Sequence, residues 1–365
     1  MARKLIVCCD GTWNNEDGAG TPTNVAKLHR IIQSNYYDGA DQIVYYVAGV
    51  GTEMGERIRG GAFGKGLDEN IREAYRFLVG HYEEGDQLFF FGFSRGAYTA
   101  RSLAGFIRNS GLLKPEFVGQ LSAAFKLYRG RSDTTHPNSD EATEFRARYS
   151  YTPDIEFIGV WDTVGSLGIP VSRLGILSWF GRWVDRRYAF HDTDLSRIVK
   201  HAYHAIAVHE RRGTFPATLW KKQADVEGQV LEQVWFPGVH CDVGGGYYTT
   251  GLSDAAFDWM IEKAKGCGLK FREEALQHGV LLAPDPIGKL HDSYGFFFKL
   301  IDWMNGQIGG APRAFNADTA SCEQVSNIAK DRFRSKKDET WPESFLSELR
   351  REHTDEGARV RDIHP

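Results

Sequence analysis

The chain has 365 residues, a formal net charge of −4 and 42% hydrophobic residues, an ordinary composition for a globular protein with a large core. The near-neutral charge balance argues against a nucleic-acid partner. Five scattered cysteines argue against a disulfide framework. The apolar run after the basic N-terminus ends at Asp10, which is too short for a signal peptide, and no apolar run is long enough to span a bilayer. We therefore expect a cytoplasmic protein.

The predicted elements alternate between strands and helices. In chain order they are a strand at 5–9, a helix at 25–32, a strand at 42–47, a glycine-rich connection at 49–66, a helix at 67–82, a strand at 86–91, a helix at 97–107, a strand at 155–161, a helix at 201–212 and a strand at 230–236. This alternation predicts an α/β fold with a mostly parallel central sheet and helices on both faces.

The remaining segments predict inserts and a tail around one catalytic domain. We expect the domain to span 1–325, with helical, cap-like inserts near 115–150, 167–200 and 270–310, and a charged C-terminal tail over 326–365.

Residues 176–187 are apolar and aromatic and then basic. This pattern suits contact with a membrane surface, or a lid over an acyl pocket. The alternative is that these aromatic side chains form the buried core of a cap.

The sequence Gly-Phe-Ser-Arg-Gly at 92–96 lies between a predicted buried strand and a predicted helix. A G-x-S-x-G in this position is the nucleophile elbow of α/β-hydrolases. The flanking glycines let strand and helix pass closely, and the helix N-terminus favours developing negative charge. We therefore predict that Ser94 is a catalytic nucleophile.

A serine nucleophile needs a base and an acid that orients the base, and in α/β-hydrolases these follow the serine in the order acid, histidine. Asp162 directly follows the strand at 155–161, and His240 follows the strand that ends at Phe236. Both lie just beyond the carboxyl ends of strands, where open α/β sheets place their sites. Asp242 is the rival acid. His204 and His209 are expected to be packed or solvated.

An oxyanion hole needs two backbone N–H groups. One is expected from Arg95, the residue after the nucleophile, and the other from Gly11 or Thr12 (or Trp13), after the first strand. The alternative for the Asp-Gly-Thr sequence at 10–12 is a simple β-turn, and Asp10 is a possible additional site residue.

The sequence partly matches three other kinds of site. A haloacid-dehalogenase phosphotransfer site is disfavoured because Cys8 occupies the position of its nucleophilic aspartate. The glycine-rich segment 60–66 lacks the first glycine and the final hydroxyl of a P-loop. A metal site formed by His240, Asp242 and Asp10 stays open but has no standard ligand spacing, so we expect no metal and no cofactor.

Several segments resemble an α/β-hydrolase family of bacteria and fungi that includes phospholipase effectors of the type VI secretion system. They are 9–14, 49–52, 92–101, 160–165 and 237–247, and together they cover most of the chain between 4 and 260. The resemblance implies a lipolytic serine hydrolase with Ser94 as nucleophile, and it makes type VI export compatible with the lack of a signal peptide. One departure is His209, where relatives often carry an acidic residue before Glu-Arg-Arg.

The sequence thus predicts a serine hydrolase of acyl esters of lipids, resembling a phospholipase A or lipase, that works through a Ser94–His240–Asp162 triad and an acyl-enzyme intermediate. Two alternatives stay open. The chain could be an esterase acting on non-lipid substrates, or a non-catalytic hydrolase-fold protein that binds a partner or lipid. Oligomeric state is not predicted.

Overall fold

The computed structural model describes residues 2–11, 21–33, 42–49, 60–130, 132–164, 194–213, 215–224, 226–276, 282–294, 310–316, 318–337 and 339–351. Their centre is a seven-stranded sheet with the order β2-β1-β3-β6-β7-β8-β9, in which every neighbouring pair is parallel. The strands are β1 (Lys4–Cys9), β2 (Gln42–Val47), β3 (Gln87–Phe93), β6 (Ile155–Trp161), β7 (Val199–Ala207), β8 (Val230–Phe236) and β9 (Glu323–Val325). This architecture confirms the predicted α/β-hydrolase-like fold.

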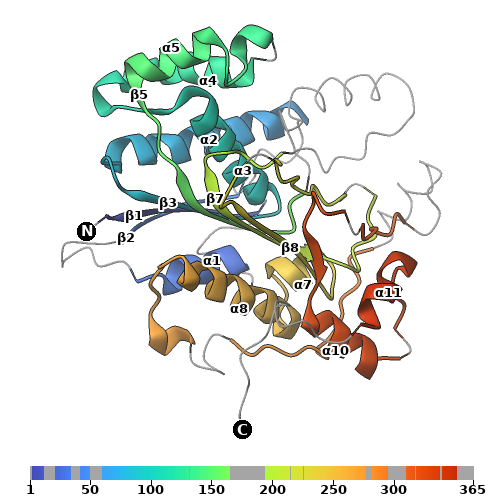
Figure 1. Ribbon diagram of the computed structural model, residues 1–365. Helices are drawn as coiled ribbons and strands as arrows, with labels where there is room; N and C mark the ends of the chain where they lie inside the picture. Colours follow the sequence, from blue (N-terminus) through green and yellow to red (C-terminus); the bar gives the residue numbers. More distant parts are fainter. Residues whose placement is uncertain are drawn as a thin grey trace.

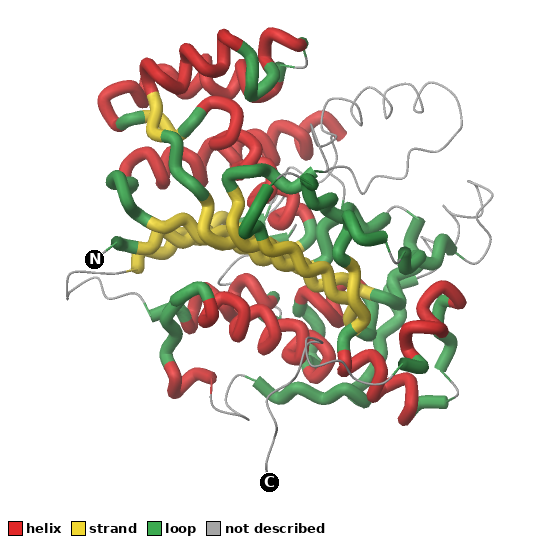
Figure 2. The backbone as a smooth tube through the Cα atoms, in the orientation of Figure 1, coloured by secondary structure: helices red, strands yellow, loops and turns green. Residues whose placement is uncertain are grey.

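Helices cover both faces of the sheet (Figures 1 and 2). One face carries α2 (Gly60–His81), α3 (Arg95–Ser110), α4 (Leu121–Arg129) and α5 (Asp140–Tyr149); the other carries α1 (Asn24–Ile31), α7 (His240–Gly244) and α8 (Gly251–Gly266). β4 (Leu112–Leu113) and β5 (Ser150–Tyr151) form a short antiparallel pair at the two ends of the α4–α5 region. Short 3₁₀ segments lie at Pro115–Gln120, Asp133–Thr135, Glu273–Leu276 and Glu343–Phe345.

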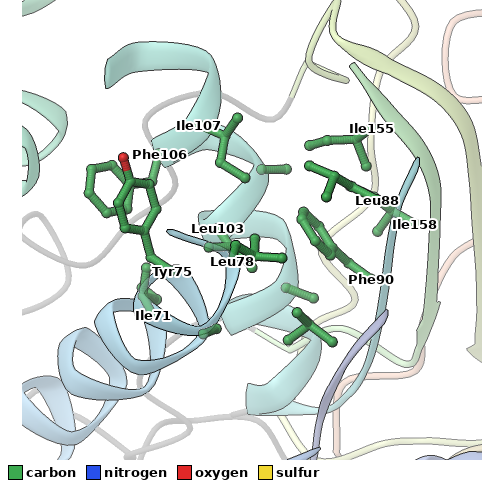
Figure 3. Packing of buried hydrophobic residues seen from close by; sticks show 14 of the residues in the cluster. Ile71, Tyr75, Leu78, Leu88, Phe90, Leu103, Phe106, Ile107, Ile155 and Ile158 are labelled. Atoms are coloured by element: carbon green, nitrogen blue, oxygen red, sulfur yellow. The ribbon is translucent and has the colours of Figure 1, made fainter. Parts of the chain in front are cut away.

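Alternation along the strands divides the core into two layers. In β1, Leu5 and Val7 belong to the cluster under α2 and α3, whereas Ile6 and Cys8 belong to the cluster over α1 and α8. Figure 3 shows the first cluster, where side chains of α2 and α3 meet those of β3 and β6. Burial on both faces explains why these strands read as nearly continuous apolar runs.

The C-terminal part forms a third cluster. α10 (Asn327–Ser335) and α11 (Leu346–Leu349) pack beside β8 and β9, and the segment buries the apolar residues Ile328, Ala329, Trp341, Phe345 and Leu349. The described part of the expected tail is therefore folded onto the sheet. Whether the catalytic domain ends at 325 stays a prediction.

The strand order places the site. After β1 the chain adds β2 on one side and then returns to add β3 on the other, so the crossover direction reverses between β1 and β3. Open α/β sheets bind ligands outside the carboxyl ends of the strands at such a point.

Two elements differ from the expectation. The helix predicted at 201–212 is wrong, because residues 199–207 form the interior strand β7. A short apolar run rich in alanine and histidine does not distinguish a buried strand from a helix by periodicity. Helix α2 begins at Gly60 rather than at residue 67; once a helix is nucleated, each added hydrogen bond helps to offset the cost of its glycines.

The predicted inserts are only partly described. The region 115–150 contains α4 and α5. The aromatic and basic segment 176–187 lies outside the described residues, as do most of 167–200 and much of 270–310. Among the described helices, none combines the length and the apolar character needed to cross a membrane.

Candidate active site

Ser94 occupies a sharp turn between β3 and α3. Its backbone has φ 57° and ψ −119°, a conformation that costs a non-glycine residue about 1–3 kcal/mol. The turn is tight enough that a Cβ on Gly92 would lie 2.5 Å from the Gly96 carbonyl oxygen, and a Cβ on Gly96 would lie 2.1 Å from the Cys9 oxygen. The two flanking glycines are therefore required by the packing of strand against helix, as the elbow pattern predicts.

Asp162 and His240 form a buried pair beside this turn. Asp162 follows β6 directly and is fully buried, with φ 40°. His240 is the first residue of α7, and its Nδ1–H donates to Asp162 Oδ2 at 2.5 Å. The imidazole packs against Phe93, the residue before Ser94, with ring centroids 4.6 Å apart. Three residues far apart in sequence are thus brought to the carboxyl ends of parallel strands in the same sheet.

A second residue, Arg313, completes the surroundings of Asp162. Its Nη1 donates to Oδ1 at 2.5 Å and its Nη2 to Oδ2 at 3.1 Å. Burial alone would raise the pKa of Asp162, but the charge of Arg313 and the hydrogen bond from His240 hold it well below its usual range. Nothing in the sequence pointed to Arg313, since no motif surrounds it.

His204 supports the same loop from the centre of the sheet. Its Nε2 accepts the Thr163 N–H at 3.0 Å, and its Nδ1–H donates to Gln233 Oε1 at 3.3 Å. Burial, with the nearby charge of Arg101, lowers the pKa of His204 to about 3. His204 is therefore a neutral histidine of β7, and it anchors the residue that follows Asp162.

Asp242, the rival acid, faces a different histidine. Its Oδ1 accepts from His291 Nδ1 at 2.6 Å, while its Oδ2 accepts the N–H groups of Val239 at 3.0 Å and His291 at 3.2 Å. His291 Nε2 in turn lies 2.9 Å from Thr249 Oγ1. Asp242 thus connects the loop before His240 to the 282–294 segment.

Glu210 is a further buried group that sequence reasoning missed. Its carboxylate accepts the backbone N–H of His240 at 3.3 Å, the Ser293 hydroxyl at 2.9 Å, and two bonds from the Arg212 guanidinium. Burial opposes ionisation, but Arg212 lowers the pKa of Glu210 to about 2. The Glu-Arg-Arg motif was the available signal. It lies in an extended loop after β7, where it holds the backbone of the site histidine.

Burial also affects the protonation of His240. Removal from water lowers the pKa of His240, against the opposing effect of the hydrogen bond to Asp162. His209, by contrast, accepts the Gly238 N–H on Nδ1 and packs against Trp341, away from the pair.

The predicted oxyanion donors lie on two elements. Arg95 is the first residue of α3, at the positive end of the helix dipole. Gly11 follows β1, but its N–H donates to Asp10 Oδ1 at 2.6 Å. Asp10 is buried, and also accepts from Thr23 Oγ1 and the Tyr46 hydroxyl. Thr12 lies outside the described residues.

The residues weighed for a metal site take different partners. His240 faces Asp162, Asp242 faces His291, and Asp10 faces Thr23 and Tyr46. Within the described ranges, no three His, Cys, Asp or Glu side chains gather as metal ligands.

Comparison with known proteins finds a similar yeast sequence, similar solved structures and a matching family model. The uncharacterized protein YEL023C of Saccharomyces cerevisiae is 33% identical over 235 residues, which cover 58% of this chain and 32% of the relative. The chain thus spans about a third of that protein's length.

Two solved structures are similar. An uncharacterized protein from Pseudomonas aeruginosa has a TM-score of 0.46 at 19% identity, covering 85% of this chain and 51% of that one. The Tle1 effector, solved bound to the VgrG spike of the type VI secretion system, has a TM-score of 0.44 at 15% identity, covering 88% and 84%.

A family model matches most of the chain, including all three residues of the predicted triad. The model of the catalytic domain of Tle1-like type VI secretion phospholipase effectors matches residues 3–263, which include Ser94, Asp162 and His240. The chain belongs to this Tle1-like phospholipase effector family.

Proposed function

We propose that this protein is a serine hydrolase that cleaves carboxylic esters of lipids, with Ser94 as nucleophile, His240 as general base and Asp162 as the orienting acid. The observation that carries the proposal is the buried Asp162–His240 pair at 2.5 Å, packed against the strained turn of Ser94. A hydroxyl, an imidazole and a carboxylate in this relation are what nucleophilic acyl transfer needs.

In the proposed reaction, Ser94 Oγ adds to the ester carbonyl carbon while its proton passes to His240 Nε2. Asp162 stabilises the imidazolium that forms. The tetrahedral intermediate then expels the alcohol, which takes the proton back from His240 and leaves acyl-Ser94. Water repeats the same steps to release the fatty acid.

The developing oxyanion needs donors already aimed at it. The Arg95 N–H at the start of α3 is one candidate, supported by the positive end of the helix dipole. For Gly11 to be the second, it would exchange its bond to Asp10 for one to the substrate. Thr12 remains the other candidate.

Membership of a family described as phospholipase effectors supports a lipid ester as substrate. Membrane contact through 176–187, cytoplasmic residence and export by a type VI route stay predictions, as does a phospholipase A-type specificity.

The nucleophile is tested with Ser94→Ala. The variant should lose labelling by a fluorophosphonate probe, and its kcat on a short-chain nitrophenyl ester should fall by about 10⁶. Ser102→Ala, a buried serine in the same helix, is the matched control and should keep both. Labelling that persists in Ser94→Ala would assign the nucleophile elsewhere.

The substrate class is tested with a mixed panel of phospholipids, triglycerides and water-soluble esters. Release of fatty acid from phospholipid by the wild type, and not by Ser94→Ala, supports the proposal. Activity confined to soluble esters would favour the esterase alternative, and no activity on any ester would favour a binding protein.

A further inference from the structure

Arg313 lies fifty residues beyond the end of the family match, yet it makes a two-point contact with Asp162. A planar guanidinium that donates to both carboxylate oxygens fixes the plane of the carboxylate as well as its position. The family signature therefore ends before a residue that touches the proposed acid.

The contacts of Asp162 leave it one orientation. Oδ1 accepts from Arg313 Nη1 and from the Ala207 N–H at 3.0 Å; Oδ2 accepts from Arg313 Nη2 and from His240 Nδ1. These four donors match the roughly four acceptor sites of a carboxylate. Because the side chain is fully buried, rotating it would break several bonds at once with no water to replace them.

Arg313 is itself held on two sides. It is 8% exposed, and it donates to the carbonyl oxygens of Ala207 at 2.9 Å and Phe215 at 2.7 Å. The chain before it is attached through the Ala311 N–H, which donates to Arg211 O at 2.8 Å. The guanidinium thus bridges the end of β7 and the segment that packs Phe215 against His240.

The charge of Arg313 has its own effect on the pair. A buried carboxylate is costly unless it is compensated, and a lone carboxylate would strongly favour protonation of the histidine it touches. The charged groups around His240 are Asp162 and Glu210, which favour the imidazolium, and Arg212, which opposes it. Arg313 offsets the negative charge of Asp162 at its source.

We propose that Arg313 is a positioning residue of the Ser94–His240–Asp162 triad, which holds the Asp162 carboxylate oriented toward His240 and keeps His240 a neutral base. The inference rests on the proposed function for its catalytic meaning. It also implies that the segment 310–316 is part of the catalytic unit.

The experiment uses the 365-residue chain and four variants. Arg313→Gln removes the charge, and Arg313→Lys keeps the charge but loses the two-point contact. Arg332→Gln is the matched control, because Arg332 is also buried and also donates to one carboxylate, that of Glu339, and to two backbone carbonyls. The readouts are the pH profile of kcat/KM on a nitrophenyl ester and an NMR titration of the His240 ring, assigned with His240→Gln.

In Arg313→Gln, the His240 titration and the acid limb of kcat/KM should both move upward by about one pH unit. Arg313→Lys should keep the titration near that of the wild type while kcat falls. Arg332→Gln should change neither pH midpoint. A His240 titration unchanged in Arg313→Gln overturns the inference.

The NMR titration tests the role of Arg313 independently of whether the protein hydrolyses esters. If the wild type labels at Ser94 but the Arg313→Gln titration does not move, only the role of Arg313 fails. If no Ser94 labelling or hydrolysis occurs, the proposed function fails while the titration still decides the effect on His240. If Arg313→Gln does not fold, a His240 pKa in Arg313→Lys that is raised by as much as one unit contradicts the charge argument.

Discussion

Two aspartate–histidine pairs meet in the α7 region, and they differ in burial and in what surrounds them. Asp162 contacts His240 Nδ1 at 2.5 Å, and Asp242 contacts His291 Nδ1 at 2.6 Å. The first pair adjoins the strained Ser94 turn, and its aspartate is held by Arg313.

The second pair lies nearer the surface. The ring of His291 stacks on Tyr247 at 4.0 Å, and its Nε2 lies beside Thr249, next to the 92% exposed Tyr248. Asp242 also accepts two backbone N–H groups, so its contacts tie loops together. A short carboxylate–imidazole contact is therefore common to both pairs. The neighbouring Ser94, the proposed nucleophile, and the charge of Arg313 are what favour chemistry at the first.

Of the changes that separate the two pairs, Asp162→Asn, which breaks the first pair, has the largest expected effect. We expect kcat to fall by about 10⁴, because an amide favours the wrong imidazole tautomer. Circular dichroism should accompany the kinetics, since the change also leaves the buried Arg313 without its counter-charge. A folded variant with near wild-type kcat would remove Asp162 from the triad.

The matched change in the second pair is Asp242→Asn. We expect the free energy of unfolding to fall by about 1–3 kcal/mol, as charge-assisted hydrogen bonds to His291 are lost. Most of the ester hydrolysis should remain. Denaturant unfolding and kcat measured on the same sample check both parts. A collapse of kcat here, with Asp162→Asn active, would reverse the assignment of the two aspartates.

An effect on stability alone, and only toward acid pH, is expected from His204, a buried histidine whose ring contacts a backbone N–H and an amide instead of a carboxylate. Its pKa is about 3 when folded, against an ordinary value of 6.5. Between these values the unfolded chain binds the proton and the folded chain does not, so stability falls as pH falls.

The measurement compares wild type and His204→Gln by denaturant unfolding at pH 7 and pH 5. The wild type should lose about 2 kcal/mol more than the variant between these pH values. Equal losses in the two proteins would mean that His204 takes up a proton without cost in the folded state.

The central strands illustrate how far sequence reasoning reached. The bounds predicted for the strands at 155–161 and 230–236 match those observed, because mainly apolar segments followed by Asp or Pro-Gly are a local signal. Strand β7 was not predicted, because nine residues are too few for apolar periodicity to distinguish a buried strand from a buried helix. That distinction depends on which elements pack around the segment.

The sequence by itself determined the α/β class, the Ser94 turn and the two candidates that follow later strands, since each depends on residues close together in the chain. Only the tertiary structure decided which aspartate faces which histidine, because Asp242 is two residues from His240 yet points to His291. It alone brought Arg313 to Asp162 and His204 behind Thr163. Such long-range pairings depend on how the strands are ordered in the sheet, and a local pattern carries no record of that order.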